Sequence, residues 1–227
     1  FAQPHRMTQT VTAGGIIRRW CLLTMYCCLC ATSSLHAQVK KTDSLFAVIA
    51  SHQDDSNAIK AYAKLAEYYR FQQPDSAVYF ANITIDKAGK KELQRFAASG
   101  YNSIGYAQYM KGDYTKAMEA FVQYYRVSKE INDVTNMAFA LNNQGNVYIE
   151  LGDYAAAIEK HKEALALRQK NKDAYGVAAS YNNLGFISKD LGDYETAVSY
   201  FLFALREFEK LNDKPAIAIC HTPPHCT

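Results

Sequence analysis

Two stretches decide the fold: NNQGNVYIELGDYAAAIEKHKEA at residues 142–164 and NNLGFISKDLGDYETAVSYFLFA at residues 182–204. They begin 40 residues apart, and a looser copy, NSIGYAQYMKGDYTKAMEAFVQY, occupies residues 102–124. Each copy has the pattern of a helix, a short break at Gly-Asp, and a second helix. A repeat period of roughly 20–50 residues indicates stacked supersecondary units, each of which buries its apolar face against its neighbours.

Alignment of the chain in steps of 40 residues gives four rows that share small residues. Small side chains at fixed positions let the two helices of a pair approach closely. A further column is glycine in three rows, and glycine inside a helix costs about 1 kcal/mol relative to alanine. A cost repeated three times predicts close helix contact at that point. The alanine columns are Ala58, Ala98, Ala138 and Ala178, then Ala77, Ala117, Ala157 and Ala197, and the glycines are Gly105, Gly145 and Gly185.

The break inside each unit also repeats. Gly112-Asp113-Tyr114 recurs at residues 152–154 and 192–194, whereas the first row has Gln-Gln-Pro-Asp at residues 72–75. Glycine can take the left-handed conformation that ends one helix, and aspartate can cap the free amides of the next. Because these aspartates recur at a turn, capping is favoured over acid–base catalysis. The tyrosines after them are expected to pack in the core.

These columns resemble the tetratricopeptide repeat. The resemblance rests on Asn143-Gln144-Gly145, Gly152-Asp153-Tyr154, Ala157, His161 and Ala164, and on their equivalents 40 residues later. The usual period of that repeat is about 34 residues, so the chain is similar to the long-helix variety found in signalling and adaptor proteins. The resemblance implies an all-α solenoid, a right-handed superhelix of about four helix pairs with a partial fifth.

The expected organisation has four parts. Residues 1–37 are a leader, residues 38–55 a short leading helix, and residues 212–227 an unfinished fifth repeat with an irregular tail. We expect the tail to come from a truncated or frame-shifted portion of a longer protein. The four repeats between them are 56–91, 92–131, 132–171 and 172–211.

The leader has the pattern of an export signal. Arg18-Arg19 precede the apolar run Trp20–Ala31, and a cleavage site is plausible between Ala37 and Gln38, with Met7 as the start. The run is shorter than the roughly 20 residues of a membrane span. An exported, periplasmic or cell-envelope location is therefore expected, with membrane attachment through an uncleaved leader or a downstream span. A buried helix of the fold is the other interpretation of this segment.

Charge and motifs exclude several function classes. Three of the 25 basic residues and none of the 22 acidic ones precede Gln38, which leaves 22 of each sign and no basic stripe for nucleic acid. The sequence has no phosphate-binding glycine loop, nucleophile elbow or His-Glu-x-x-His motif. We therefore expect neither an enzyme nor a cofactor or metal site.

Two histidine features have metal-binding alternatives. His161 occupies the column of Phe121 and Phe201, which favours a packed side chain over a ligand. The tail residues 220–226 contain two cysteines and two histidines, but Pro223-Pro224 interrupts any helix there. A zinc site in the tail is the minor alternative.

The resemblance implies that the first helix of each repeat lines a concave groove. Residues one helical turn apart share a face, asparagine can donate to and accept from a peptide backbone, and aromatic rings supply apolar anchors. Asn142-Asn143 and Asn182-Asn183, and with them Asn102, could instead hydrogen-bond within or between repeats, an alternative that weighs more for Asn143 and Asn183 than for the Asn102 column. The predicted groove residues are Tyr62, Tyr69, Asn102, Tyr106, Tyr109, Asn142, Asn146, Ile149, Asn182, Phe186 and Lys189.

The expected function is binding of a protein or peptide by a non-catalytic scaffold. An export signal followed by such repeats resembles the N-terminal region of bacterial membrane-anchored sensor proteins of the histidine-kinase type. The alternative is a free-standing exported adaptor that organises an envelope complex. Sequence of the locus beyond Thr227 would separate the two, because a membrane span and a kinase core in frame would favour the sensor.

Overall fold

The computed structural model describes residues 42–51, 55–89 and 93–211. The chain divides into two compact units, residues 1–47 and residues 48–227. Of the first unit only residues 42–47 are described, and they are helical. The expectations for the leader, its cleavage site and the tail from residue 212 lie outside the described residues.

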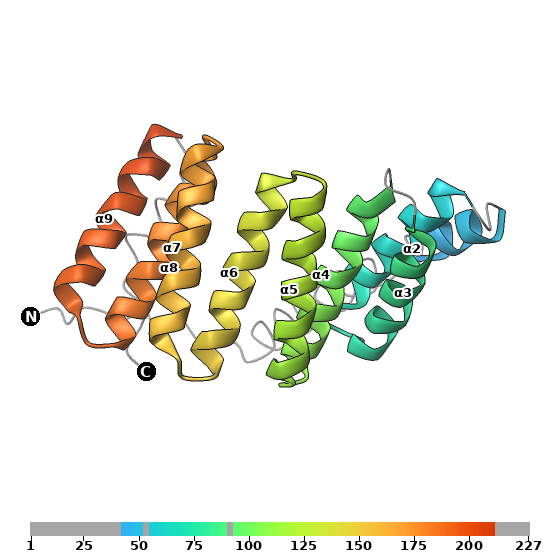
Figure 1. Ribbon diagram of the computed structural model, residues 1–227, viewed down its shortest axis with the longest axis horizontal. Helices are drawn as coiled ribbons and strands as arrows, with labels where there is room; N and C mark the ends of the chain where they lie inside the picture. The colour runs from blue at the N-terminus through green and yellow to red at the C-terminus, as the bar shows by residue number, and fades with distance from the viewer. Residues whose placement is uncertain (1–41, 52–54, 90–92, 212–227) are drawn as a thin grey trace, which may run out of the picture. The chain divides into compact units, whose positions relative to one another are not determined.

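The second unit is a succession of helices. Each helix packs against the next along the chain, α2 also contacts α4, and Figure 1 shows the helices side by side. All labelled elements of the described residues are α-helices, so the predicted all-α stack is confirmed. The helices are α2 (Ser56–Tyr69), α3 (Pro74–Lys87), α4 (Gln94–Met110), α5 (Tyr114–Glu130), α6 (Val134–Glu150), α7 (Tyr154–Lys170), α8 (Ala174–Asp190) and α9 (Tyr194–Lys210).

The predicted turns inside the helix pairs are confirmed. Gly112, Gly152 and Gly192 have φ angles of 75°, 77° and 79°, in the left-handed region that favours glycine. The Asp153 side chain accepts a hydrogen bond of 3.0 Å from the backbone N–H of Ala156, and the aspartates of the other two turns cap in the same way. The divergent first pair uses Pro74 in the first turn of α3, without a side-chain cap.

Two of the turns between successive helix pairs also end in a capping aspartate, but the residue before it is not glycine. Asp133 caps α6 and Asp173 caps α8 through their side chains. The residue before each aspartate, Asn132 or Lys172, has a φ of 55°. Asparagine tolerates the left-handed region, whereas lysine does so at a cost. The Lys172 turn is therefore the more strained of the two.

The repeated small residues form the centre of the stack. All eight alanines of the two alanine columns are 0–2% exposed. A Cβ on Gly145 would lie 2.7 Å from Nε2 of His161, and one on Gly185 would lie 2.7 Å from Cε1 of Phe201. The Phe121 ring crowds Gly105 in the same way. The glycine column therefore admits one ring from the second helix of the same pair.

His161 is packed, as expected, but it is polar where the other pairs are apolar. It is fully buried, and neither ring nitrogen has a hydrogen-bond partner among the described residues. Burial, and after it the charge of Arg168, lower the pKa of His161 to about 4. Arg168 is 4% exposed, and its Nη1 donates to the Ser180 hydroxyl at 2.7 Å and the Gly176 carbonyl at 3.1 Å. Helix α7 thus buries a neutral histidine against α6 and an arginine against α8.

The expectation that the turn tyrosines pack in the core is wrong for one of them. Tyr114 and Tyr154 are half-buried, whereas Tyr194 is 68% exposed. Val198, one turn further along α9, is 57% exposed, although Met118 and Ile158 in the same column are half-buried. No described helix follows α9 to cover this face. The turn tyrosine is therefore half-buried only in those pairs that another described helix pair follows.

Candidate peptide-binding face

The predicted groove residues lie on the first helices of the four pairs. Tyr62 and Tyr69 belong to α2, and α4, α6 and α8 each contribute three of the others. All are half-buried except Phe186, which is 36% exposed. We call this set of eleven residues the first-helix face. Every member keeps some surface accessible to a partner.

Asparagine pairs connect this face from one repeat to the next. Asn143 Nδ2 donates to Asn102 Oδ1 at 3.1 Å, and Asn183 Nδ2 donates to Asn142 Oδ1 at 2.7 Å. The Tyr106 hydroxyl donates to Asn143 Oδ1 at 3.1 Å. Asn143 and Asn183 therefore join adjacent repeats, which resolves the alternative that the sequence left open for them.

The same pairs leave donors unused. Within the described residues, the side-chain amides of Asn102 and Asn142 accept these bonds but donate none. Asn146 and Asn182 make no side-chain hydrogen bond to any described residue. Because the partner asparagines fix the orientation of the first two amides, their N–H groups are directed before any ligand arrives. These four side chains can bind a peptide backbone.

A small pocket opens on the face between α4 and α6. Its volume is about 70 Å³, and its walls come from Tyr106, Tyr109, Phe121, Asn143 and Asn146. Liquid water occupies about 30 Å³ per molecule. The pocket is therefore large enough to admit a small polar group.

Glu150 orders the tyrosines at the end of α4. It accepts hydrogen bonds from the Tyr109 hydroxyl at 2.6 Å and the Tyr114 hydroxyl at 3.1 Å. Burial, followed by the hydrogen bond to Glu150, raises the pKa of Tyr109. Tyr109 is therefore a protonated donor at neutral pH, and its ring is held by the neighbouring repeat.

The α8 end of the face is aromatic and cationic. The Phe186 ring meets Phe201 edge to face, with 5.2 Å between ring centroids. Lys189 Nζ lies 5.8 Å from the Phe186 centroid and 3.6 Å from an Asp190 carboxylate oxygen. At the other end, Tyr62 and Tyr69 stack on Phe80 at 6.3 Å and 5.8 Å. These rings combine a packing role with an accessible edge.

Arg70, the residue that ends α2, is a feature of this end that the sequence did not indicate. Its guanidinium carbon lies 4.8 Å from the Phe71 ring centroid and 4.7 Å from the Tyr106 centroid. Its Nε is buried and bonds to no residue in the part of the chain that the structure describes. No column of the alignment marks it, because the equivalent residues are Met110, Glu150 and Asp190.

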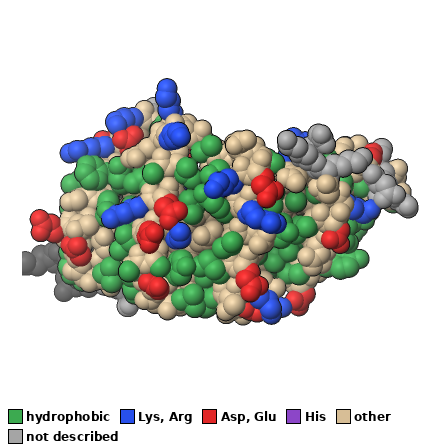
Figure 2. Space-filling model, in the orientation of Figure 1, with side chains coloured by type: hydrophobic (Ala, Val, Ile, Leu, Met, Phe, Trp, Pro, Cys, Tyr) green, Lys and Arg blue, Asp and Glu red, His purple; other side chains and the backbone are tan. Residues whose placement is uncertain are grey.

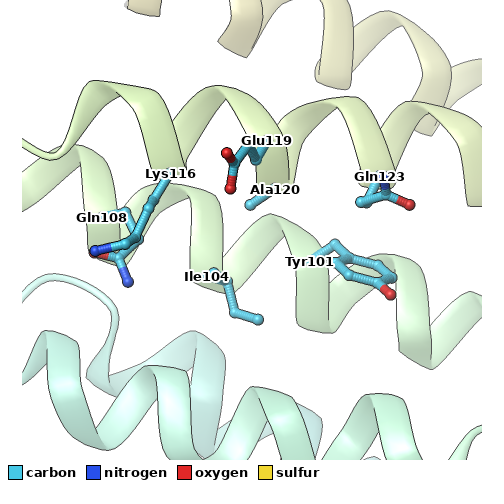
Figure 3. Close-up of a pocket in the computed structure, with 7 residues that line it drawn as sticks. All are labelled: Tyr101, Ile104, Gln108, Lys116, Glu119, Ala120 and Gln123. Atoms are coloured by element: carbon cyan, nitrogen blue, oxygen red, sulfur yellow. The ribbon is translucent and has the colours of Figure 1, made fainter.

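A larger pocket lies elsewhere, between the two helices of the second pair. It has a volume of about 390 Å³ and shares no residue with the first-helix face. Figure 3 shows α4 and α5 each sending side chains toward it. Lys116, the cation at its edge, already pairs with Asp113 at 2.7 Å. The lining residues are Tyr101, Ile104, Gln108, Lys116, Glu119, Ala120 and Gln123.

The surface charge is mixed. On the side shown in Figure 2, basic and acidic side chains alternate over apolar and neutral surface. Over the described ranges, no cluster of three or more His, Cys, Asp or Glu side chains could hold a metal ion. None of the described helices is long and apolar enough to cross a membrane.

Comparisons with known proteins define the class of these repeats. Residues 96–170 and residues 177–212 each match a sequence profile of the tetratricopeptide repeat. The fold is a tetratricopeptide-type solenoid, and the matched residues are tetratricopeptide repeats. A comparison with curated proteins gives no significant match.

Solved structures with the same fold come from several kinds of protein. The apo form of RapI superimposes with a TM-score of 0.69 at 20% identity, over 80% of this chain and 67% of that one. A Rap protein complexed with Competence and Sporulation Factor gives 0.70 at 19% identity, over 82% and 54%. A signal transduction ATPase of Pyrococcus horikoshii with a tetratricopeptide repeat sensor gives 0.62 at 20%, over 71% and 25%. At these identities the likeness shows the fold, and the chain spans only part of each structure.

Proposed function

We propose that this protein is a non-catalytic scaffold that binds an extended peptide or a partner segment on its first-helix face. The observation that carries the proposal is the row of asparagine amides with unused donors, two of which, Asn102 and Asn142, are oriented by hydrogen bonds between repeats. An extended peptide presents N–H and C=O groups at regular spacing, which such amides can pair. The flanking tyrosines and Phe186 supply apolar contact.

The structure supports this mode because the face is ordered before binding. Asn143 is 3% exposed and linked to both Asn102 and Tyr106, so those two side chains have little freedom left to lose. A preorganised surface loses less conformational entropy when it binds. The face can therefore hold a flexible ligand without a large conformational change of its own.

As a biological role, we propose the sensory or interaction region of a larger bacterial signalling protein, exported to the cell envelope. The fold is shared with Rap proteins and with the sensor-bearing ATPase, and it also occurs in proteins of other kinds. The leader-like pattern of residues 1–37 supports export. A free-standing exported adaptor is the second candidate, and the leader-like pattern of residues 1–37 supports it equally.

The binding proposal is tested by selection followed by substitution. A random heptapeptide library, displayed with free C termini, is selected against the full chain, and the enriched peptides are synthesised for fluorescence-polarisation titration. We expect the double variant Asn142→Ala/Asn182→Ala to bind them about fivefold to 150-fold more weakly, because each amide contributes about 0.5–1.5 kcal/mol. Asn82→Ala, an exposed amide on the second helix α3, is the matched control and should bind as the original chain does.

Two results would remove the proposal. One is a library that yields no enriched peptide. The other is an enriched peptide whose affinity is unchanged in the double variant while circular dichroism shows intact helicity.

A further inference from the structure

Arg70 holds a charge that the described protein does not neutralise. Its guanidinium lies against the rings of Phe71 and Tyr106, at 4.8 Å and 4.7 Å, and no ion pair with a described residue involves it. Asp75, further along the chain, pairs with Lys111 at 2.7 Å, and Glu150 accepts hydrogen bonds from two tyrosine hydroxyls. The cation is therefore unpaired, although the aromatic rings stabilise it.

The same contacts fix the orientation of the guanidinium. Nε is buried and has no partner among the described residues, whereas the two terminal nitrogens are not among the buried unpartnered atoms and bond to no described residue, so they remain open to a ligand. An arginine stacked on aromatic rings presents its remaining N–H donors as a rigid fork. That fork matches the two oxygens of a carboxylate and can hold them bidentately.

Tyr106 connects this cation to the peptide-binding face. One ring carries the Arg70 guanidinium, meets Phe121 edge to face at 5.6 Å, and forms a wall of the 70 Å³ pocket. Asn146, on another wall of the pocket, has an unused side-chain amide. The cation and the pocket thus share the Tyr106 ring, which places the guanidinium next to the asparagine-bearing face.

We infer that Arg70 is the specificity residue of the face and selects ligands that carry a carboxylate next to the backbone segment bound by the asparagines. This inference rests on the proposed peptide binding and adds the chemical class of the ligand: an acidic peptide. The carboxylate can come from an aspartate or glutamate side chain or from the peptide's C terminus. Without such a group, binding would leave the guanidinium partly desolvated and unpaired.

The test uses the same heptapeptide library on three full-length chains: the original, Arg70→Gln, and the control Arg206→Gln, which removes an exposed arginine from α9. We expect peptides selected by the original chain and by Arg206→Gln to share an acidic position or a required free C terminus. Peptides selected by Arg70→Gln should lack that preference. Circular dichroism establishes that the variants are folded.

Synthetic peptides then separate the two sources of the carboxylate. One selected peptide is titrated as the free acid, as the C-terminal amide, and with its acidic residue replaced by Asn or Gln. We expect one of these neutral forms to lose at least about tenfold in affinity for the original chain, because hydrogen bonds to charged groups are the stronger kind. The same form should lose little in affinity for Arg70→Gln.

The possible failures are distinct. Enriched peptides that depend on Asn142 and Asn182 but tolerate every neutral substitution would overturn the role of Arg70 and leave the binding face in place. If the neutral form of the peptide lost equal affinity for Arg70→Gln and for the original chain, the role of Arg70 would likewise be overturned while the binding face stood. A library without enriched peptides would overturn both proposals.

Discussion

Replacing His161 by phenylalanine should stabilise the protein. His161 is fully buried, and both of its nitrogens lack hydrogen-bond partners, while the same column holds Phe121 and Phe201 against a glycine in the other pairs. A buried polar group without a partner costs about 1–3 kcal/mol. His161→Phe removes that cost and keeps a ring opposite Gly145, so the free energy of unfolding at pH 7.5 should rise by about 1–3 kcal/mol.

The gain should grow in acid. The pKa of His161 is about 4 in the folded chain against 6.5 for an unperturbed histidine, so the unfolded chain takes up the proton first as the pH falls. The free energy of unfolding is therefore unaffected by this titration above pH 6.5. It falls as the pH is lowered from 6.5 to about 4. At pH 5 the loss is about 2 kcal/mol, at roughly 1.4 kcal/mol per pH unit. The phenylalanine variant has no such loss at this position.

Urea unfolding followed by circular dichroism at pH 7.5 and pH 5.0 measures both effects. Phe121→His is the reciprocal control, because Phe121 is 1% exposed and packs against Gly105. That variant should lose stability and become more sensitive to acid. The reasoning would be refuted if His161→Phe were no more stable than the original chain at pH 7.5 and lost stability equally between the two pH values.

Two further predictions concern the framework. Asn143→Ala should lower the free energy of unfolding by about 1–3 kcal/mol, because it leaves the half-buried partners Tyr106 and Asn102 unpaired. The control Asn146→Ala, which breaks no bond to a described residue, should change it by no more than about 0.5 kcal/mol. Equal effects of the two substitutions in urea unfolding would contradict the inter-repeat role of Asn143. Asp153→Ala should lower the free energy of unfolding by about 1 kcal/mol through loss of the α7 cap, and the control Asp153→Asn should have a smaller effect. An unchanged midpoint of thermal unfolding in Asp153→Ala would argue against capping.

The features that the sequence predicted correctly are the ones that every repeat needs. The glycines at the turns, the capping aspartates and the buried alanines recur at a 40-residue step because each helix pair has the same backbone to satisfy. The contact of Gly185 with the Phe201 ring was predictable for the same reason. Repetition separates architecture from ligand contacts, since a residue required by the fold appears in every row.

The features that the sequence did not reveal belong to single rows. Arg70 stacks on Tyr106, a residue of the next repeat, and the residues in the column of Arg70 share no common chemistry. Asn142 and Asn143 are adjacent and equally polar, yet one accepts from the following repeat and the other donates to the preceding one. That difference depends on the register between helices, which composition and spacing leave undetermined. Tyr194 is exposed because no described helix covers it.

The most direct test of the central claim is to locate a bound peptide by nuclear magnetic resonance. Backbone and side-chain amide signals of the full chain are followed during titration with a peptide selected from the library. The account predicts that the largest shift changes fall on the first-helix face, including the side-chain amides of Asn102, Asn142 and Asn182. Changes centred instead on Gln108 and Gln123, in the larger pocket between α4 and α5, would contradict it.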